Sequence, residues 1–209
     1  MTRIYLVRHA TVENPRNVLY GHLDNFPLSV RGREEATALG RRLRQGGLSR
    51  IVHSPLERAE ETAHLIAAQL SAPPDLIVDS ELREAEFSRY LQGVLYWQIP
   101  IRRPLWFVHK ARRGLLPGDE SYRVMGGRVV QVMHRVAREH PDDVSALISH
   151  ADPLQAAWIL LEGRPQNERE MHRKMVDRAG VLEVDLEEGQ VRAVNYVPPP
   201  KLTVAAPAA

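Results

Sequence analysis

Four residues suited to binding and transferring a phosphoryl group lie just beyond short apolar runs in the sequence. They are Arg8, His9, Arg58 and His150, and the runs are residues 4–7, 50–53 and 144–148. Such runs predict buried strands. Ligands bind outside the carboxyl ends of the strands in an open α/β sheet, so we expect these residues to meet in one crevice. Two arginines, two histidines and nearby helix N-termini would form a pocket for a dianionic phosphate.

None of these residues is diagnostic by itself. An arginine on a helix is most often solvated, and a lone histidine is most often a core or capping residue. The hypothesis depends on their shared position at the ends of strands, where a phosphate could reach all four.

The helices that follow these strands are predicted from capping residues and apolar spacing. Ser29 precedes apolar residues at helical spacing and is expected to cap a helix that ends before two consecutive glycines. Ser54, followed by Pro55 and Glu57, is typical of a capping box. Asp152, followed by a proline, is expected to cap another helix in the same way.

Further strand segments complete the predicted sheet. One is the apolar run 76–78, and two alternating segments, 182–186 and 191–194, flank Gly189 as an antiparallel hairpin. Strands alternating with helices predict an α/β protein, a three-layer α/β/α sandwich on a mainly parallel sheet with the hairpin at one edge. We expect one domain over 1–197, with a small insertion at about 94–117, and a flexible Pro/Ala-rich tail over 198–209.

Composition narrows the class of protein. The chain has 209 residues, 44% of them hydrophobic and 26% charged, which is typical of a globular protein. It has no cysteine, so disulfides, thiolate metal sites and cysteine nucleophiles are excluded. The net charge is only +2, and no segment resembles a signal peptide or a membrane span. We therefore expect a cytoplasmic protein with no membrane or nucleic-acid partner.

Six blocks of the sequence, in order, resemble the motifs of the histidine phosphatase superfamily, also called the phosphoglycerate mutase-like family. The blocks are residues 6–11 (LVRHAT), 27–32 (PLSVRG), 54–59 (SPLERA), 82–87 (LREAEF), 118–121 (GDES) and 149–154 (SHADPL). The resemblance covers 3–93 and 118–163. Six ordered blocks are far more specific than any one motif.

The resemblance implies a phosphoglycerate mutase-like fold and a role for each central residue. His9 would be the nucleophile that becomes phosphohistidine, and Arg8, Arg58 and His150 would hold the phosphoryl oxygens. Glu84 would be the general acid and base, chosen over the neighbouring glutamates by its place in the LREAEF block. Neither a metal nor another cofactor is expected, because arginine and histidine supply the positive charge.

The resemblance also suggests substrate contacts, although the sequence departs from the common pattern there. Asn14, Tyr20, Gly21 and Ala151 are the expected substrate-binding residues. Asn14 lies one residue closer to His9 than is usual. Alanine replaces the glycine that most often follows each of the two site histidines, at positions 10 and 151.

The insertion and the exact reaction leave alternatives open. The insertion mixes aromatic and basic residues, so it could be a lid that selects the leaving group, a homodimer surface or an RNA contact. The reaction predicted from the residue set is hydrolysis of a small phosphorylated metabolite. The alternatives are a cofactor-dependent phosphoglycerate mutase and a non-catalytic phosphate-binding module.

Overall fold

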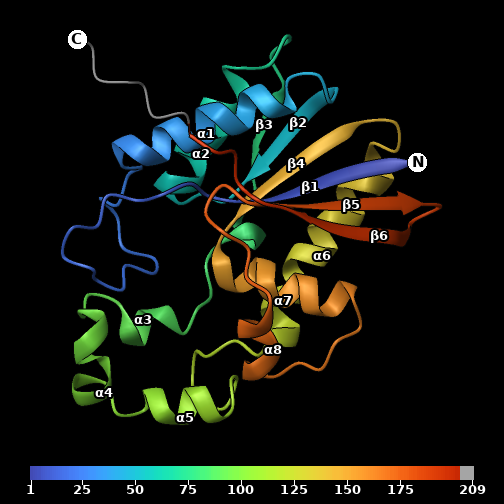
Figure 1. Ribbon diagram of the computed structural model, residues 1–209. Coiled ribbons are helices and arrows are strands. Elements are labelled where there is room, and N and C mark those ends of the chain that lie inside the picture. Colours follow the sequence, from blue (N-terminus) through green and yellow to red (C-terminus); the bar gives the residue numbers. More distant parts are fainter. Residues whose placement is uncertain (203–209) are drawn as a thin grey trace, which may run out of the picture.

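A six-stranded sheet forms the centre of the computed structural model, which describes residues 1–202 (Figure 1). Its strands lie in the order β3-β2-β4-β1-β5-β6. Their bounds are β1 Thr2–Arg8, β2 Leu48–His53, β3 Asp75–Val78, β4 Val144–Ser149, β5 Val181–Glu187 and β6 Gln190–Val197. β1, β2, β3 and β4 pair in parallel, and β5 and β6 run antiparallel to their neighbours. The predicted mainly parallel sheet with an edge hairpin is confirmed.

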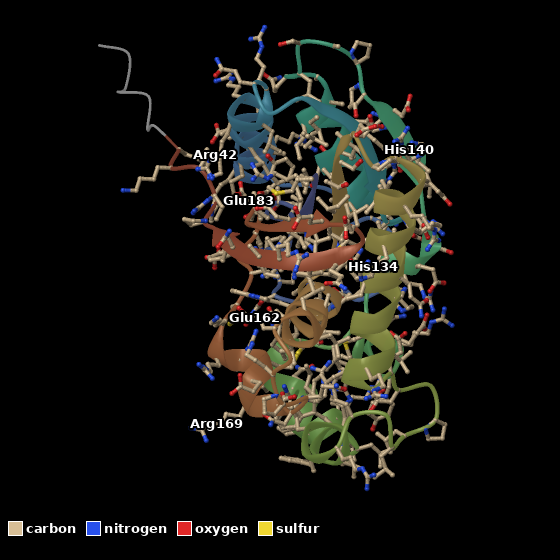
Figure 2. The ribbon with its side chains drawn as sticks, turned by 90° about the vertical axis from the view of Figure 1, so that its right-hand side faces the viewer. Arg42, His134, His140, Glu162, Arg169 and Glu183 are labelled. Atoms are coloured by element: carbon tan, nitrogen blue, oxygen red, sulfur yellow. The ribbon has the colours of Figure 1, made fainter. Side chains whose placement is uncertain are left out.

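Helices cover both faces of this sheet, as predicted for a three-layer sandwich (Figure 1). α1 (Val30–Leu43) and α2 (Glu57–Ala67) pack on one face, and α6 (Tyr122–Glu139) and α7 (Ala151–Leu161) pack on the other. Alternation along β1 explains the two cores, because successive strand side chains point to opposite faces. Figure 2 shows these layers from the side, with His134 on α6 and Glu183 on β5.

The helix starts were predicted correctly in one case and wrongly in two. Ser29 caps α1, and its hydroxyl accepts a hydrogen bond from the Gly32 amide at 3.1 Å. α2 begins at Glu57 rather than after Ser54, and its cap position makes no side-chain hydrogen bond. α7 begins at Ala151, so Asp152 lies inside its first turn instead of at the cap. Both misplaced polar side chains are used in the functional site described below.

The insertion predicted at about 94–117 lies within a layer of short helices beneath the main body, which we call the cap (residues 88–118). It contains α3 (Ser88–Leu91), a 3-10 turn (Tyr96–Gln98), α4 (Ile99–Arg102) and α5 (Trp106–Ala111). In Figure 1 these helices lie together at the end of the molecule away from α1 and α2. Beside them, α8 (Glu168–Arg173) follows α7.

The chain beyond β6 runs along α1. The Pro198 carbonyl accepts a hydrogen bond from Arg42 at 2.7 Å. Most of the predicted tail, residues 203–209, lies outside the described residues. Within residues 1–202, no helix combines the length and the apolarity needed to cross a membrane.

Candidate active site

The carboxyl ends of β1, β2 and β4 lie side by side in the centre of the sheet. Arg8 is paired with Ser149, and the His9 amide donates to the Ser149 carbonyl at 3.0 Å. On the other side of β4, the Ser54 amide donates to the Ile148 carbonyl at 3.0 Å. Backbone pairing therefore brings His9 and His150 together, although 140 positions separate them in the chain.

His9 is held as a neutral imidazole with one free nitrogen. Its ring is 1% exposed, and Nδ1 lies 2.8 Å from the Ala10 carbonyl oxygen. A carbonyl only accepts hydrogen bonds, so Nδ1 carries the proton and Nε2 keeps its lone pair. Burial lowers the pKa of His9 well below its ordinary value, and the charges of Arg58 and Arg8 lower it further. The Nε2 atom therefore presents a free lone pair to the site.

His150 stands against His9 at the start of α7. The two ring centroids are 5.2 Å apart, and the His150 side chain is fully buried. Its Nε2 lies 2.8 Å from the Ser54 hydroxyl, which also accepts a hydrogen bond from the Leu56 amide at 3.3 Å. Burial and the charge of Arg58 lower the pKa of His150 well below its ordinary value. Ser54 thus orients a site histidine, which explains why it does not cap α2.

Two arginines supply the positive charge of the site. Arg8 donates to the Val176 carbonyl at 2.8 Å, and Arg58 donates to the Gly21 carbonyl at 2.8 Å. The Arg58 guanidinium also stacks on the Tyr20 ring, 4.8 Å from its centroid. Within the described residues, the buried Nε atoms of both arginines and Nδ1 of His150 have no hydrogen-bond partner. Buried polar atoms are normally hydrogen-bonded in native proteins, and an anion would accept hydrogen bonds from the arginine Nε–H groups.

Glu84 places a carboxyl group next to the histidines. Its Oε2 is 3.9 Å from His150 Nδ1, and its Oε1 accepts from the Ala85 amide at 3.0 Å. Burial raises the pKa of Glu84 to about 7, and the nearby Asp152 charge adds to that rise. Glu84 can therefore hold a proton near neutral pH. The Ser149 hydroxyl holds this loop by donating to the Leu82 carbonyl at 2.7 Å.

The two neighbouring glutamates are engaged elsewhere. Glu81 and Glu86 both pair with Arg83, at 3.2 Å and 2.9 Å. Glu86 also pairs with Arg89 at 3.0 Å. Of the three carboxylates in this loop, Glu84 is the one that lies in the site.

These groups open into a cavity of about 460 Å³ between the strand ends and the cap. The expected site residues that line it are Arg8, His9, Tyr20, Gly21, Glu84 and Ala151. Arg58 and His150 are buried against that lining. The cap contributes an apolar wall that consists of Leu91, Tyr96, Ile99, Pro100 and Trp106.

Asn14 is placed differently from the expectation. Its amide oxygen accepts from the Val18 amide at 3.0 Å, and its amide nitrogen donates to the Val18 carbonyl at 2.8 Å. Both polar atoms therefore close the 14–18 loop. Among the described residues that line the cavity, Asn14 is absent. The one-residue shift in its spacing is the sequence feature that accompanies this change.

Comparison with known proteins agrees with this architecture. The model of the histidine phosphatase superfamily (branch 1) matches residues 4–197. The chain belongs to this superfamily.

Individual relatives extend over nearly the whole chain. The Salmonella paratyphi B protein named "Probable phosphoglycerate mutase GpmB" is 28% identical over 94% of this chain and 91% of its own length. The structure of Bacillus stearothermophilus YhfR is 21% identical, with a TM-score of 0.82 over 92% of this chain and 95% of that one. The mycobacterial glucosyl-3-phosphoglycerate phosphatase Rv2419c, in its VO3 complex, is 22% identical, with a TM-score of 0.76 over 93% and 97%. The two structural matches show the superfamily's fold.

Several polar residues of the cavity were missed by sequence reasoning. Arg113 from the cap pairs with Asp152 at 2.8 Å and lies 3.6 Å from Glu168 on α8. The rings of Phe87 and Tyr122 flank its guanidinium at 4.8 Å and 5.1 Å. Burial by itself would raise the pKa of Asp152, but the Arg113 charge outweighs it and lowers that pKa.

Arg178 also lines the cavity, beside Arg8 and His9. It lies between α8 and β5, where no motif of the sequence singled it out. For Asp152, the one available sequence signal was the proline that follows it. That signal indicated a helix cap and not a position in the cavity. Contacts with residues far away in the sequence decide these positions, so local patterns could not reveal them.

Proposed function

We propose that this superfamily member is a metal-independent phosphatase that hydrolyses a small phosphomonoester through a phosphohistidine on His9. The observation that supports this most directly is the pairing of protonation states in one cavity. His9 Nε2 is unprotonated because Nδ1–H donates to the Ala10 carbonyl, while the partly buried Glu84 has a pKa raised to about 7. A nucleophile and a proton donor thus coexist at neutral pH.

In the first half-reaction, His9 Nε2 attacks phosphorus and the ester bond to the leaving group breaks. Arg8, Arg58 and His150 surround the phosphoryl oxygens and stabilise their charge in the transition state. The protonated Glu84 gives its proton to the leaving oxygen, so the product departs as a neutral alcohol. Glu84 becomes a carboxylate in the same step.

In the second half-reaction, water replaces the leaving group. The Glu84 carboxylate takes a proton from that water as its oxygen attacks phosphorus, and the P–N bond to His9 breaks. The site then holds inorganic phosphate, neutral His9 and protonated Glu84, which restores the starting state.

Hydrolysis is favoured over a mutase reaction by the charges at the cap side of the cavity. A mutase must hold a substrate with a second acidic group and shield the phosphohistidine from water. The cap cations facing the cavity are Lys110 and Arg113, and both are paired, with Glu168 and with Asp152. They are therefore poor candidates for binding a second phosphate. The mutase name of the Salmonella relative keeps the alternative worth testing directly.

The test is phosphate release from a panel of phosphomonoesters in excess EDTA, comparing wild type with His9→Ala. We expect release that survives EDTA and disappears in the variant. Conversion of 3-phosphoglycerate that requires 2,3-bisphosphoglycerate would indicate a mutase instead. If the protein binds phosphate but shows neither turnover nor a trapped phosphoenzyme, it is a non-catalytic module and the proposal is contradicted.

A further inference from the structure

The exposed side chains of residues 93–118, which we call the outer face of the cap, have an unusual composition for a protein surface. Within 93–118, every exposed residue is glycine, proline, an apolar residue or arginine. Trp97 is 70% exposed and Ile101 is 77% exposed. The other exposed large apolar side chains of this segment are Tyr96, Leu105, Phe107 and Leu115. Large exposed apolar patches on a soluble domain mark interaction sites.

The same segment concentrates the positive charge of the chain. Residues 88–118 contain six Lys and Arg and no Asp or Glu, which gives +6, whereas the whole chain has a net charge of +2. The other residues therefore carry −4. Carboxylates outside the cap neutralise Arg89, Lys110 and Arg113. Within residues 1–202, no carboxylate pairs with Arg102, Arg103 or Arg112.

This charge pattern argues against self-association through the cap. In a two-fold symmetric dimer, the same patch faces itself, so any carboxylate that pairs with these arginines must come from the patch. The cap has none, and two copies would bring like charges together. The partner must therefore supply negative charge as well as apolar contact.

A nucleic acid would satisfy only part of this surface. Its phosphates would match the arginines and its bases would stack on Trp97 or Phe107. Stacking gives no role to the exposed aliphatic side chains of Ile101, Leu105 and Leu115. An anionic bilayer offers both requirements together, because acidic headgroups lie directly above an apolar layer that accepts Trp, Phe, Ile and Leu.

We propose that the outer face of the cap docks on the surface of a membrane that contains anionic phospholipid. Figure 1 shows α3, α4 and α5 at one end of the molecule, where the main body would not obstruct a flat surface. Tyr96 and Pro100 are exposed and also line the cavity, so docking brings the cavity rim to the lipid interface. The proposal replaces the sequence-based expectation of no membrane partner, which depended on the lack of a spanning segment. It does not depend on the proposed reaction.

Co-sedimentation of the full chain with sucrose-loaded vesicles tests this surface. We expect binding to phosphatidylglycerol/phosphatidylcholine vesicles, much weaker binding to pure phosphatidylcholine, and release by high salt. Each surface arginine contributes about fivefold in affinity, so Arg102→Gln/Arg112→Gln should weaken binding about 25-fold. Trp97→Ser/Ile101→Ser should also weaken it, through loss of apolar insertion.

Matched variants away from the cap serve as controls. Arg41→Gln/Arg138→Gln removes the same charge from exposed positions near the carboxyl ends of α1 and α6, and Figure 1 shows α1 at the end of the molecule away from the cap helices. This control should bind vesicles nearly as well as wild type. All variants should hydrolyse p-nitrophenyl phosphate at the wild-type rate if the catalytic proposal holds, because none of these residues lies in the catalytic machinery.

Three outcomes would overturn the proposal. The first is equal binding to anionic and neutral vesicles, or no binding to either. The second is a loss of binding in the α1/α6 control that matches the loss in the cap variants. The third is dimerisation or RNA binding that depends on Trp97 and Arg102 while vesicle binding does not. Thermal unfolding of each variant separates a lost surface from a lost fold.

Discussion

The ends of the central strands and the cap face each other across one cavity, yet they are built in opposite ways. His9, Arg58 and His150 are at most 1% exposed, and strands or long helices hold them through hydrogen bonds to the backbone or to Ser54. The cap consists of helices of four to six residues with exposed apolar side chains. Helices this short have little stability of their own.

The difference indicates which part of the molecule sets which property. Groups that react must stay within a fraction of an ångström, and backbone pairing between strands gives that precision. The cap is tied to the body by backbone hydrogen bonds to residues 17–19 and by Arg113, which pairs with Asp152 and lies near Glu168. Because Arg8, His9, Arg58 and His150 lie outside the cap, its surface can differ without moving them.

Removing His9, the proposed nucleophile, would be the sharpest test of the strand-end region. We expect His9→Ala to lower kcat by at least about 10⁴-fold on every phosphomonoester, because the other groups cannot form the covalent intermediate. His64→Ala, on the exposed side of α2, is the matched histidine control and should keep wild-type activity. Steady-state phosphate release measures both. Substantial hydrolysis by His9→Ala would mean that the strand ends bind phosphate but do not attack it.

Glu84→Gln tests the proton donor that faces the histidines. For an alkyl phosphate we expect kcat/KM to fall about 10²- to 10⁴-fold, since a poor leaving group needs protonation. Wild-type kcat/KM should be high below pH 7 and fall as pH rises through about 7, because the proton on Glu84 is lost there. The variant should lack that fall.

A substrate with a good leaving group provides the control for this variant. p-Nitrophenyl phosphate should lose much less activity in Glu84→Gln, because its leaving group needs little protonation. Equal losses on both esters would contradict a general-acid role for Glu84.

Arg113→Gln tests the attachment of the cap. The change leaves Asp152 without its partner in a largely buried site, so the free energy of unfolding should fall by about 3 kcal/mol. The neighbouring Arg112 is exposed, so Arg112→Gln should change the free energy of unfolding by less than about 0.5 kcal/mol. Urea unfolding measures both. Similar values for the two variants would show that the ion pair does not anchor the cap.

Asp152→Asn should give the smallest effect, a shift in pH dependence. The Asp152 charge raises the pKa of Glu84, so its removal should lower that pKa. The fall of kcat/KM at high pH should then begin at a lower pH, while activity on the acidic side changes little. If kcat/KM of Asp152→Asn falls over the same pH range as in wild type, the Asp152 charge does not contribute to the raised pKa of Glu84.

Sequence patterns predicted the strands, the layers and the placement of Arg8, His9, Arg58 and His150 because these follow from local rules. A β-branched run forms a buried strand, and a polar residue at its carboxyl end faces the ligand side of the sheet. The same rules failed for Ser54 and Asp152, where a partner far away in the chain competes with the helix N-terminus. The prediction for Asn14 was wrong for the opposite reason. Its side-chain amide is hydrogen-bonded to the backbone of Val18, only four residues away.

The pairing of β1 with β4 joins positions 141 apart, as in Arg3 with Val144. To form contacts this distant in the sequence, the chain must close a long loop. The entropy of loop closure is lost before the contacts can stabilise the fold, which slows folding. β4 in turn separates β1 from β2, so the two histidines and Arg58 meet only after the central strands have paired. During synthesis the first 140 residues therefore emerge from the ribosome without an assembled site, because β4 and His150 have not yet been made.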